Sequence, residues 1–468
     1  MIMNNEMIVG RNWIKFTGDE SIQNEICTIL TYKNDGYKYL KKKWRTDKQK
    51  TKCIARKNKD GVLFRAGMLS WVLSRLLYPD TVQLNFTYDI APESNASLEY
   101  LRDYQLKAVN SVKFVGRGLI QVPTGGGKTW IGSGILSAFV GKKKVYLVHR
   151  QELIVQVSEV FDKIGLKYSV VGGGTKDSSG PIILAMVQTL SSMIKKDKAS
   201  WLKDVEVLVI DEVQHAGSPS YESVIDACCC ASVKVGLSGT IPSFKNLGGA
   251  RVLGNLGDVC YSIPPKVLID AKYVVEPVVT MHGGTWGEPY KEEYKKYNFM
   301  DPQAATQYWQ DVYELVIVSN VERNTKIAEV CRGKTGVLII VNTIRHGEIL
   351  SELMNCPFTH GGSEERFDLF DKFRNSKIPQ LIASPIMDEG IDVSGIHTVV
   401  IAAGGKSAGR LLQRVGRGMR TEAGKDHVDI LDFWDTGVKL LLGHSTERQK
   451  TYEEQGYKVT IEMPESLE

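Results

Sequence analysis

A glycine-rich run combines a flexible backbone with one cation and two hydroxyls: Pro123-Thr124-Gly125-Gly126-Gly127-Lys128-Thr129. It follows an apolar stretch and precedes a helical pattern. Glycines in such a place let backbone N–H groups close around phosphate oxygens, and the N-terminus of a helix adds its dipole. We expect Lys128 to reach the β- and γ-phosphates of ATP and Thr129 to hold Mg²⁺. A chance glycine-rich turn is the alternative interpretation.

Two adjacent acids, Asp211 and Glu212, come directly after the apolar run 205–210. A carboxylate at the C-terminal end of a parallel strand lies where such sheets place their ligands. We expect Asp211 to bind Mg²⁺, mostly through water, and Glu212 to polarise the attacking water. Paired acids can also mark a plain helix N-terminus, which favours negative charge. Because the glycine-rich run lies about 80 residues upstream, we interpret the acids as part of the same site.

These side chains need parallel sheets to position them, and the sequence from about residue 96 onward predicts such sheets. Short apolar runs alternate there with amphipathic helical patterns, which indicates βαβ units. The alternation is interrupted near 280–318 and then resumes. The expected strands are 119–122, 144–148, 182–186, 205–210, 233–237, 337–341, 381–383, 398–402 and 428–431. The fold class is therefore α/β, with two lobes in tandem.

Residues 1–95 predict a small α+β domain that contains a strongly basic segment. We expect strands at 26–32, 50–56 and 62–65, a hairpin turn at 58–61, and a helix at 67–77. The segment 33–65 holds 13 Lys and Arg against 3 Asp, a local charge of +10 in a chain of net charge +5. Such a block suits phosphate backbones, although a solvated face is the alternative. Trp44 lies within it and could stack on bases, whereas Trp71 in the helical pattern fits a core position.

The composition excludes several other classes of protein. Hydrophobic residues make up 43% of the chain, and no apolar run is long enough to span a membrane. The N-terminus lacks the pattern of a secretory signal. The eight cysteines form no CxxC pair, and the run 228–230 is best explained by free thiols. We therefore expect a globular protein of the cytoplasm, in a prokaryotic or phage-infected cell.

The phosphate loop and the two acids resemble motifs of the superfamily 2 helicase core, and further motifs of that core follow in order. In the first lobe they are 102–105, 147–153, 187–190 and 238–240; in the second they are 341–343, 360–373, 383–392 and 413–420. The resemblance covers about 97–440 and implies two RecA-like lobes. The departures are Val122, where the usual P-loop template has glycine, Gln214 in motif II, Gly239 in motif III, and Gln413 at the start of motif VI.

The resemblance also implies roles for single residues. Arg102 and Gln105 would read adenine, and the nucleotide would contact Gly390 and Asp392. Arg417 and Arg420 would stabilise the transition state together with Gln413, because the spacing places them on nearly one helical face. ATP would then lie between the lobes. The resemblance further implies backbone contacts to nucleic acid from a set of polar residues: Arg150, Gln188, Thr189, Thr343 and Ser384.

The motif variants and the basic first domain are similar to the UvsW-like branch-migration helicases of phages, whose core is related to RecG and XPB. The predicted domains are 1–95 for DNA binding, 96–278 and 319–440 for the lobes, 279–318 for a connection, and 441–468 for a tail. We expect a DNA helicase or translocase that uses ATP and Mg²⁺ on duplex or branched DNA such as forks, D-loops and four-way junctions. Single-stranded DNA-binding or recombination proteins are candidate partners. An RNA helicase, the motor of a restriction system and a non-hydrolysing clamp are the alternatives.

Overall fold

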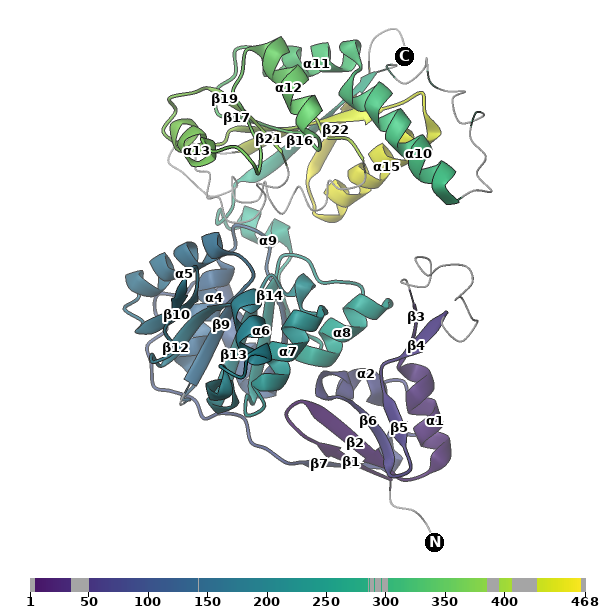
Figure 1. Cartoon of the computed structure of the whole chain (residues 1–468), viewed down its shortest axis with the longest axis vertical. Coiled ribbons are helices and arrows are strands. Elements are labelled where there is room, and N and C mark those ends of the chain that lie inside the picture. The colour runs from purple at the N-terminus through teal and green to yellow at the C-terminus, as the bar shows by residue number, and fades with distance from the viewer. Residues whose placement is uncertain are drawn as a thin grey trace. The chain divides into compact units, whose positions relative to one another are not determined.

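The structure is a computed structural model that describes residues 5–34, 50–141, 143–284, 286, 290, 296, 302–384, 395–405 and 427–463. The chain divides into two compact units (Figure 1). The first contains residues 1–122 and 127–263, and the second contains residues 123–126 and 264–468. Both consist of a sheet flanked by helices, and the first also contains the small N-terminal domain.

The N-terminal domain is built on a five-stranded sheet with the order β5-β6-β2-β1-β7. Its strands are β1 (Asn5–Val9), β2 (Trp13–Thr17), β5 (Arg56–Asn58), β6 (Gly61–Arg65) and β7 (Val82–Phe86). Strands β5 and β6 are antiparallel, and Asn58 pairs with Gly61. The hairpin turn that the sequence predicts at 58–61 is therefore confirmed.

The strand expected at 26–32 was wrong. Helix α1 (Glu20–Ile29) occupies most of that segment, and only β3 (Thr31–Lys33) is extended, paired with β4 (Thr51–Cys53). The helix forms because the Asp19 carboxylate accepts a hydrogen bond from the N–H of Ser21 and so caps its first turn. The helix expected at 67–77 is also shorter, with a 3-10 turn (Ala66–Met68) before α2 (Leu69–Leu73).

The N-terminal domain packs closely on helix α8 (Leu247–Leu256) of the first lobe. A Cβ atom on Gly67 would lie 2.2 Å from the carbonyl oxygen of Leu253, so only glycine fits there. The guanidinium of Arg65 forms a two-point ion pair with Asp226 and lies over the ring of Trp13. The domain is therefore held to the lobe by close packing of the two backbones at Gly67 and by the ion pair of Arg65 with Asp226.

The first lobe is an eight-stranded sheet with the order β11-β10-β12-β9-β13-β14-β8-β15. Every pairing in it is parallel except that of β10 with β11. The strands are β8 (Arg117–Gln121), β9 (Lys143–Val148), β10 (Tyr168–Gly172), β11 (Thr175–Lys176), β12 (Ile182–Met186), β13 (Val205–Asp211), β14 (Val233–Ser238) and β15 (Val259–Ser262). All five strands predicted for this lobe are present.

The second unit holds a seven-stranded parallel sheet with the order β18-β19-β17-β20-β21-β16-β22. Its strands are β16 (Glu276–Gly284), β17 (Val337–Ile340), β18 (Phe358–Thr359), β19 (Gln380–Ala383), β20 (Thr398–Ile401), β21 (His427–Asp435) and β22 (Lys458–Glu462). Strand β16 reaches into the predicted connection, and β22 lies in the predicted tail. Both belong to the sheet because β16 pairs with β21 on one side and with β22 on the other.

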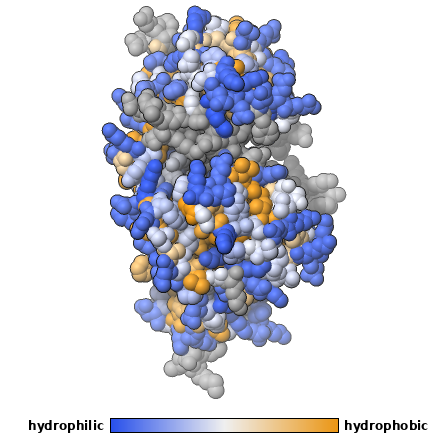
Figure 2. Space-filling model, turned by 90° about the vertical axis from the view of Figure 1, so that its left-hand side faces the viewer, coloured by the Kyte–Doolittle hydropathy of each residue, from blue (hydrophilic) through white to orange (hydrophobic). Residues whose placement is uncertain are grey.

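Helices flank these sheets (Figure 1), and the coloured residues on the face in Figure 2 are mostly hydrophilic. On the face in Figure 2, apolar residues gather in patches over the first unit. Within the described part of the chain, no helix is both long and apolar enough to cross a membrane.

Candidate functional site

The glycine-rich run opens helix α4 (Lys128–Ala138), shortly after the end of β8. Gly125 and Gly127 have φ values of 82° and 74°, a region that glycine adopts without strain. A Cβ atom on Gly127 would lie 2.4 Å from Nε2 of Gln105. The positive φ favours glycine at 127, and a larger residue there would also displace the side chain of Gln105. Lys128 and Thr129 occupy the first two positions of the helix, as predicted.

Gln105 belongs to helix α3 (Asp103–Val115) and is buried. Its side-chain oxygen accepts a hydrogen bond from the backbone N–H of Arg102 over 3.0 Å. The structure thus brings the predicted adenine-reading segment against the start of the phosphate loop helix. In this arrangement Gln105 also fixes the beginning of its own helix.

Asp211 ends strand β13 and is 5% exposed, the strand-end position that the sequence predicts. Its Oδ1 accepts from the backbone N–H of Glu212 at 2.9 Å, and its Oδ2 accepts from the hydroxyl of Tyr146 at 3.1 Å. Burial and the charge of Glu212 raise the pKa of Asp211, whereas the Lys128 ammonium lowers it. The charge of Lys128 therefore acts on the carboxylate of Asp211.

Glu212 has φ 50° and ψ 56°, a left-handed conformation that is uncommon for a residue with a side chain. Such strain collects at functional sites, where the surrounding structure holds it in place. The Glu212 carboxylate accepts a hydrogen bond from Nε2 of Gln214 at 2.9 Å. The hydroxyl of Ser238, at the end of β14, lies 2.7 Å from Oε1 of Gln214. One amide thus joins the candidate catalytic acid to the third motif.

These residues fit a magnesium–nucleotide complex. Carboxylate and hydroxyl oxygens are the ligands that Mg²⁺ prefers, and they come here from Asp211 and Thr129. The first turn of α4 offers free N–H groups and a cation to phosphates. Bound Mg²⁺ would neutralise charge on the phosphate oxygens. Among the described residues there is no group of three or more His, Cys, Asp or Glu placed to hold a metal.

Sequence reasoning missed Tyr146, which is fully buried on β9 and bonds directly to Asp211. The only available signal was a phenol within an otherwise apolar strand end, Val145 to Val148. That signal does not reveal a partner 65 residues away.

The predicted nucleic-acid contacts of the first lobe lie near the starts of two helices, α5 (Gln151–Lys163) and α6 (Val187–Lys195). Arg150 directly precedes α5, and Gln188 and Thr189 lie in the first turn of α6. Nε2 of Gln188 donates to the carbonyl of His149 over 2.8 Å. The structure therefore brings these two motifs together at the carboxyl ends of the neighbouring strands β9 and β12.

In the second unit, Thr343 caps helix α12 (Ile344–Met354), and its hydroxyl accepts from the N–H of His346. Ser384 follows β19 and is 4% exposed, so its hydroxyl does not lie on the surface. The remaining predicted site residues lie outside the described part of the chain. They are Trp44, Gly390, Asp392, Gln413, Arg417 and Arg420.

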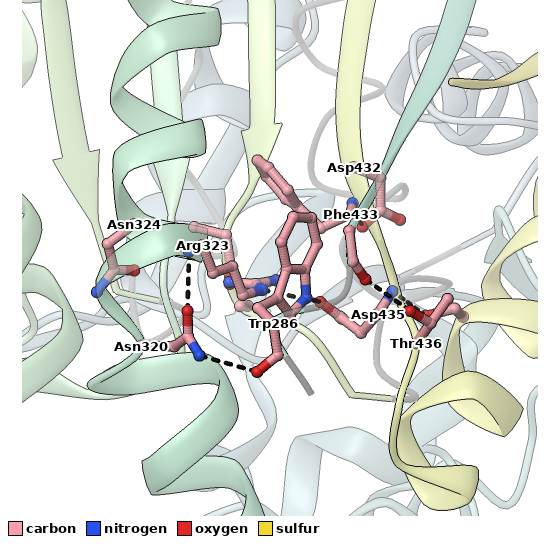
Figure 3. Close-up of polar contacts among 12 residues, drawn as sticks. Trp286, Asn320, Arg323, Asn324, Asp432, Phe433, Asp435 and Thr436 are labelled. Carbon is pink, nitrogen blue, oxygen red and sulfur yellow. Dashed lines mark hydrogen bonds and ion pairs between the residues drawn. The ribbon is translucent and has the colours of Figure 1, made fainter. Parts of the chain in front are cut away.

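The second unit also contains a fully buried ionic network at the ends of its strands (Figure 3). Asp435 Oδ1 accepts from Nε of Arg323 at 2.8 Å and from the indole N–H of Trp286 at 2.9 Å. Asp432 Oδ2 accepts from Nε of Arg448 at 2.9 Å. All four charged residues are at most 1% exposed.

The same network binds the backbone that follows β20. Arg323 donates to the carbonyl of Ala402 and Arg448 to that of Gly405, each over 2.9 Å. The hydroxyl of Tyr313 donates to the carbonyl of Ala403 over 2.6 Å. Three carbonyls ahead of the sixth predicted motif are thus held by buried donors.

Two family models match the chain. One is described as "Type III restriction enzyme, res subunit" and covers residues 99–243, and the other as "Helicase conserved C-terminal domain" and covers residues 316–422. They fall on the first lobe and on the second unit respectively.

Curated relatives and a solved structure agree with these matches. One relative is a protein of Sulfolobus islandicus filamentous virus that is provisionally named helicase 22. The two sequences are 26% identical over 71% of this chain and 64% of the relative. The chain is 22% identical to the ATP-dependent DNA helicase uvsW of Enterobacteria phage T4, over 76% of this chain and 75% of the relative. A fragment of a provisionally assigned HsdR subunit of a type I restriction enzyme from Vibrio vulnificus superposes with a TM-score of 0.55 at 16% identity, over 80% and 70% of the two chains.

The likeness to the solved structure concerns the fold, and it confirms the predicted pair of RecA-like lobes. The chain spans 64%, 52% and 50% of the lengths of the first three curated relatives that it matches. Other relatives carry names of DNA helicases, and one carries the name of an RNA helicase.

Proposed function

We propose that this chain, which has the two-lobed core of a superfamily 2 helicase and resembles UvsW, is an ATP-driven motor that remodels branched DNA. Lys128 and the N-terminus of α4 bind the phosphates of ATP. Thr129 and Asp211 hold Mg²⁺. Glu212 orients and polarises the attacking water.

One observation carries the proposal of ATP hydrolysis. Lys128, Asp211 and Glu212 lie together in the first unit, and Gln214 links Glu212 to Ser238. A binding clamp needs the phosphate loop but not a strained acid held by an amide. The link through Gln214 offers a route by which a change at the nucleotide reaches the third motif, which couples ATP to nucleic acid in the related helicases.

The arginines of the sixth motif complete the proposed chemistry. Arg417 and Arg420 stabilise charge in the transition state, a role worth roughly 10³–10⁵ in rate for finger-type arginines. Gln413 belongs to the same motif, and Gly390 and Asp392 of the fifth motif contact the nucleotide.

The proposal of DNA as substrate rests on charge and on the relatives. The block 33–65 carries a net charge of +10, and its domain is fixed to the first lobe. Arg150, Gln188, Thr189 and Thr343 lie at helix starts, which suit phosphate oxygens. Contacts of this kind carry no sequence information and give binding that weakens steeply with salt. A DNA motor acts where the DNA is, in the cytoplasm of a prokaryotic or phage-infected cell.

A steady-state ATPase assay tests the proposal. The arms are no nucleic acid, single-stranded DNA, linear duplex, forked DNA, four-way DNA and structured RNA, with Lys128→Ala as control. We expect the strongest stimulation by branched DNA and its loss in the variant. Stimulation by RNA alone would overturn the DNA assignment. A low rate with every substrate would reduce the proposal to nucleotide binding.

A second candidate is the motor subunit of a restriction system, which the family model of the first lobe favours. Such a motor would be stimulated by linear duplex as strongly as by branched DNA. The same assay therefore separates the two functions. Partners such as single-stranded DNA-binding or recombination proteins belong to the first candidate alone.

A further inference from the structure

The phenol of Tyr146 lies in the interior of the first lobe, between the elements that carry the two proposed magnesium ligands. Tyr146 is 0% exposed, and its hydroxyl donates to Oδ2 of Asp211 over 3.1 Å.

Gly132 of helix α4 leaves room for the ring of Tyr146. A Cβ atom on Gly132 would lie 2.5 Å from Cε2 of Tyr146, so a larger residue there would displace the ring. On another side, Phe161 of α5 meets the ring edge to face at 5.8 Å. Phenylalanine at 146 would fill the same space, so packing alone does not explain the hydroxyl.

The direction of the hydrogen bond leaves Asp211 able to hold a metal. The phenol has one O–H, which it donates to Oδ2 of Asp211. Asp211 keeps acceptor capacity, because each carboxylate oxygen can accept more than one bond.

We infer that Tyr146 is a positioning residue that aligns Asp211 for Mg²⁺ in the complex with ATP, an inference that rests on the proposed function. It is proposed to act through Asp211 and not by contact with the nucleotide or the metal. Groups that hydrogen-bond to metal ligands fix their orientation, and their loss costs roughly 10- to 100-fold in metal affinity or activity.

The test is Tyr146→Phe, with Mn²⁺ as the probe. We expect Mn²⁺ binding in the presence of ATP, followed by electron paramagnetic resonance, to weaken roughly 10- to 100-fold. The Mg²⁺ concentration for half-maximal ATPase should rise by a similar factor. Binding of a fluorescent ATP analogue in EDTA should be unchanged, because the phosphate contacts of Lys128 and α4 remain.

Tyr168→Phe is the matched control. Its ring also packs on Phe161, edge to face at 5.3 Å, but on β10 and away from Asp211. It should leave metal binding unchanged. Gly132→Ala is a second variant that keeps the hydroxyl and displaces the ring, and it should weaken Mn²⁺ binding as well. Thermal unfolding verifies that each variant is folded.

The outcomes separate this inference from the proposed function. Equal Mn²⁺ affinity of wild type and folded Tyr146→Phe overturns the inference and leaves the ATPase proposal intact. A wild type that binds Mn²⁺ and ATP but hydrolyses none overturns the motor proposal, and the binding comparison still decides the role of Tyr146. Failure of the wild type to bind Mn²⁺ with ATP overturns both.

Discussion

The side-chain amide of Gln214 donates a hydrogen bond to Oε2 of Glu212 over 2.9 Å. Because its oxygen lies 2.7 Å from the hydroxyl of Ser238, the amide has a partner at each end. The backbone of Glu212 is strained, with φ 50°, and the hydrogen bond from Gln214 gives its carboxylate a fixed direction. The amide is therefore placed both to aim the candidate base and to transmit its position to Ser238.

Gln214→Ala should slow ATP hydrolysis while leaving ATP binding intact. Without the amide, Glu212 loses its orientation, and misplacement by about 1 Å can cost roughly 10²-fold. Stimulation by DNA should fall further than the basal rate, because the link to Ser238 is also lost. Steady-state ATPase with and without forked DNA, together with binding of a fluorescent ATP analogue, measures both effects.

Gln188→Ala is the control for this substitution. It removes another glutamine amide of the same lobe, one that bonds to the carbonyl of His149 instead of an acid. It should weaken DNA stimulation without changing the basal rate. A Gln214→Ala protein with normal basal and stimulated rates would remove the amide from the mechanism.

Asp435→Asn should destabilise the second unit. The buried carboxylate of Asp435 pairs with Arg323 (Figure 3). It also pairs with Arg448, so neutralising it leaves two buried cations short of a counter-charge. Breaking a buried ion pair of this kind costs about 3–5 kcal/mol. The urea-unfolding transition of the second unit should shift to lower concentration, followed by the fluorescence of the buried Trp286.

Glu454→Gln provides the comparison. Glu454 pairs with Lys450 on the exposed side of α15 (Lys439–Glu454), where an ion pair contributes little. The urea-unfolding midpoint of Glu454→Gln should match that of the wild type. An Asp435→Asn midpoint equal to that of Glu454→Gln would show that the network is not held together by charge.

The sequence predicts best those features that depend on local pattern. The run at 182–186 is continuous and apolar, and it forms β12 with the predicted bounds because a central parallel strand is buried on both faces. Asp211 follows such a run and ends its strand, as expected. The phosphate loop is equally local, since its glycines, lysine and helix start are adjacent in the chain.

The features that the sequence did not predict depend on contacts between distant segments. Residues 26–32 are rich in β-branched and apolar types, which favour a strand. The cap at Asp19 nevertheless starts a helix that continues through Ile29. Tyr146 resembles an ordinary core aromatic until β9 and β13 pair. Strand β22 is short and mostly exposed, so only its pairing with β16 identifies it as part of the sheet.

Lys234 predicts a pH dependence of stability for the first unit. It is 0% exposed and donates to the carbonyl of Arg11 and to the side chain of Asn12 in the N-terminal domain. Burial lowers its pKa to about 7, with Arg117 contributing in the same direction. Between pH 7 and about 10.5 the unfolded chain binds a proton that the folded chain has released, so rising pH stabilises the fold.

The measurement is the urea midpoint of the first unit between pH 7 and 9 for wild type and Lys234→Met. The wild type should gain stability relative to the variant by at most about 1.4 kcal/mol per pH unit. Lys15→Met, which removes an exposed lysine of the same unit, should follow the wild type. Parallel pH curves for wild type and Lys234→Met would show that the lysine stays charged when buried.

Gly67→Ala should loosen the N-terminal domain from the first lobe. The added Cβ atom would lie 2.2 Å from the carbonyl of Leu253 and 2.6 Å from the N–H nitrogen of Gly257, and neither backbone atom can move without shifting α8. If the basic domain delivers DNA to the lobe, stimulation of the ATPase by branched DNA should fall severalfold. The basal rate should stay the same, because the nucleotide site lies on other elements. Limited proteolysis between 86 and 103 would detect the released domain.

Gly443→Ala is the matched control, since a Cβ atom there meets nothing within 4 Å. In helix α15 that change should be neutral or stabilising by up to about 1 kcal/mol. Equal stimulation of Gly67→Ala and wild type would mean that the domain serves DNA as a tethered module, independent of its docking. Loss of basal activity as well would mean that α8 supports the nucleotide site directly.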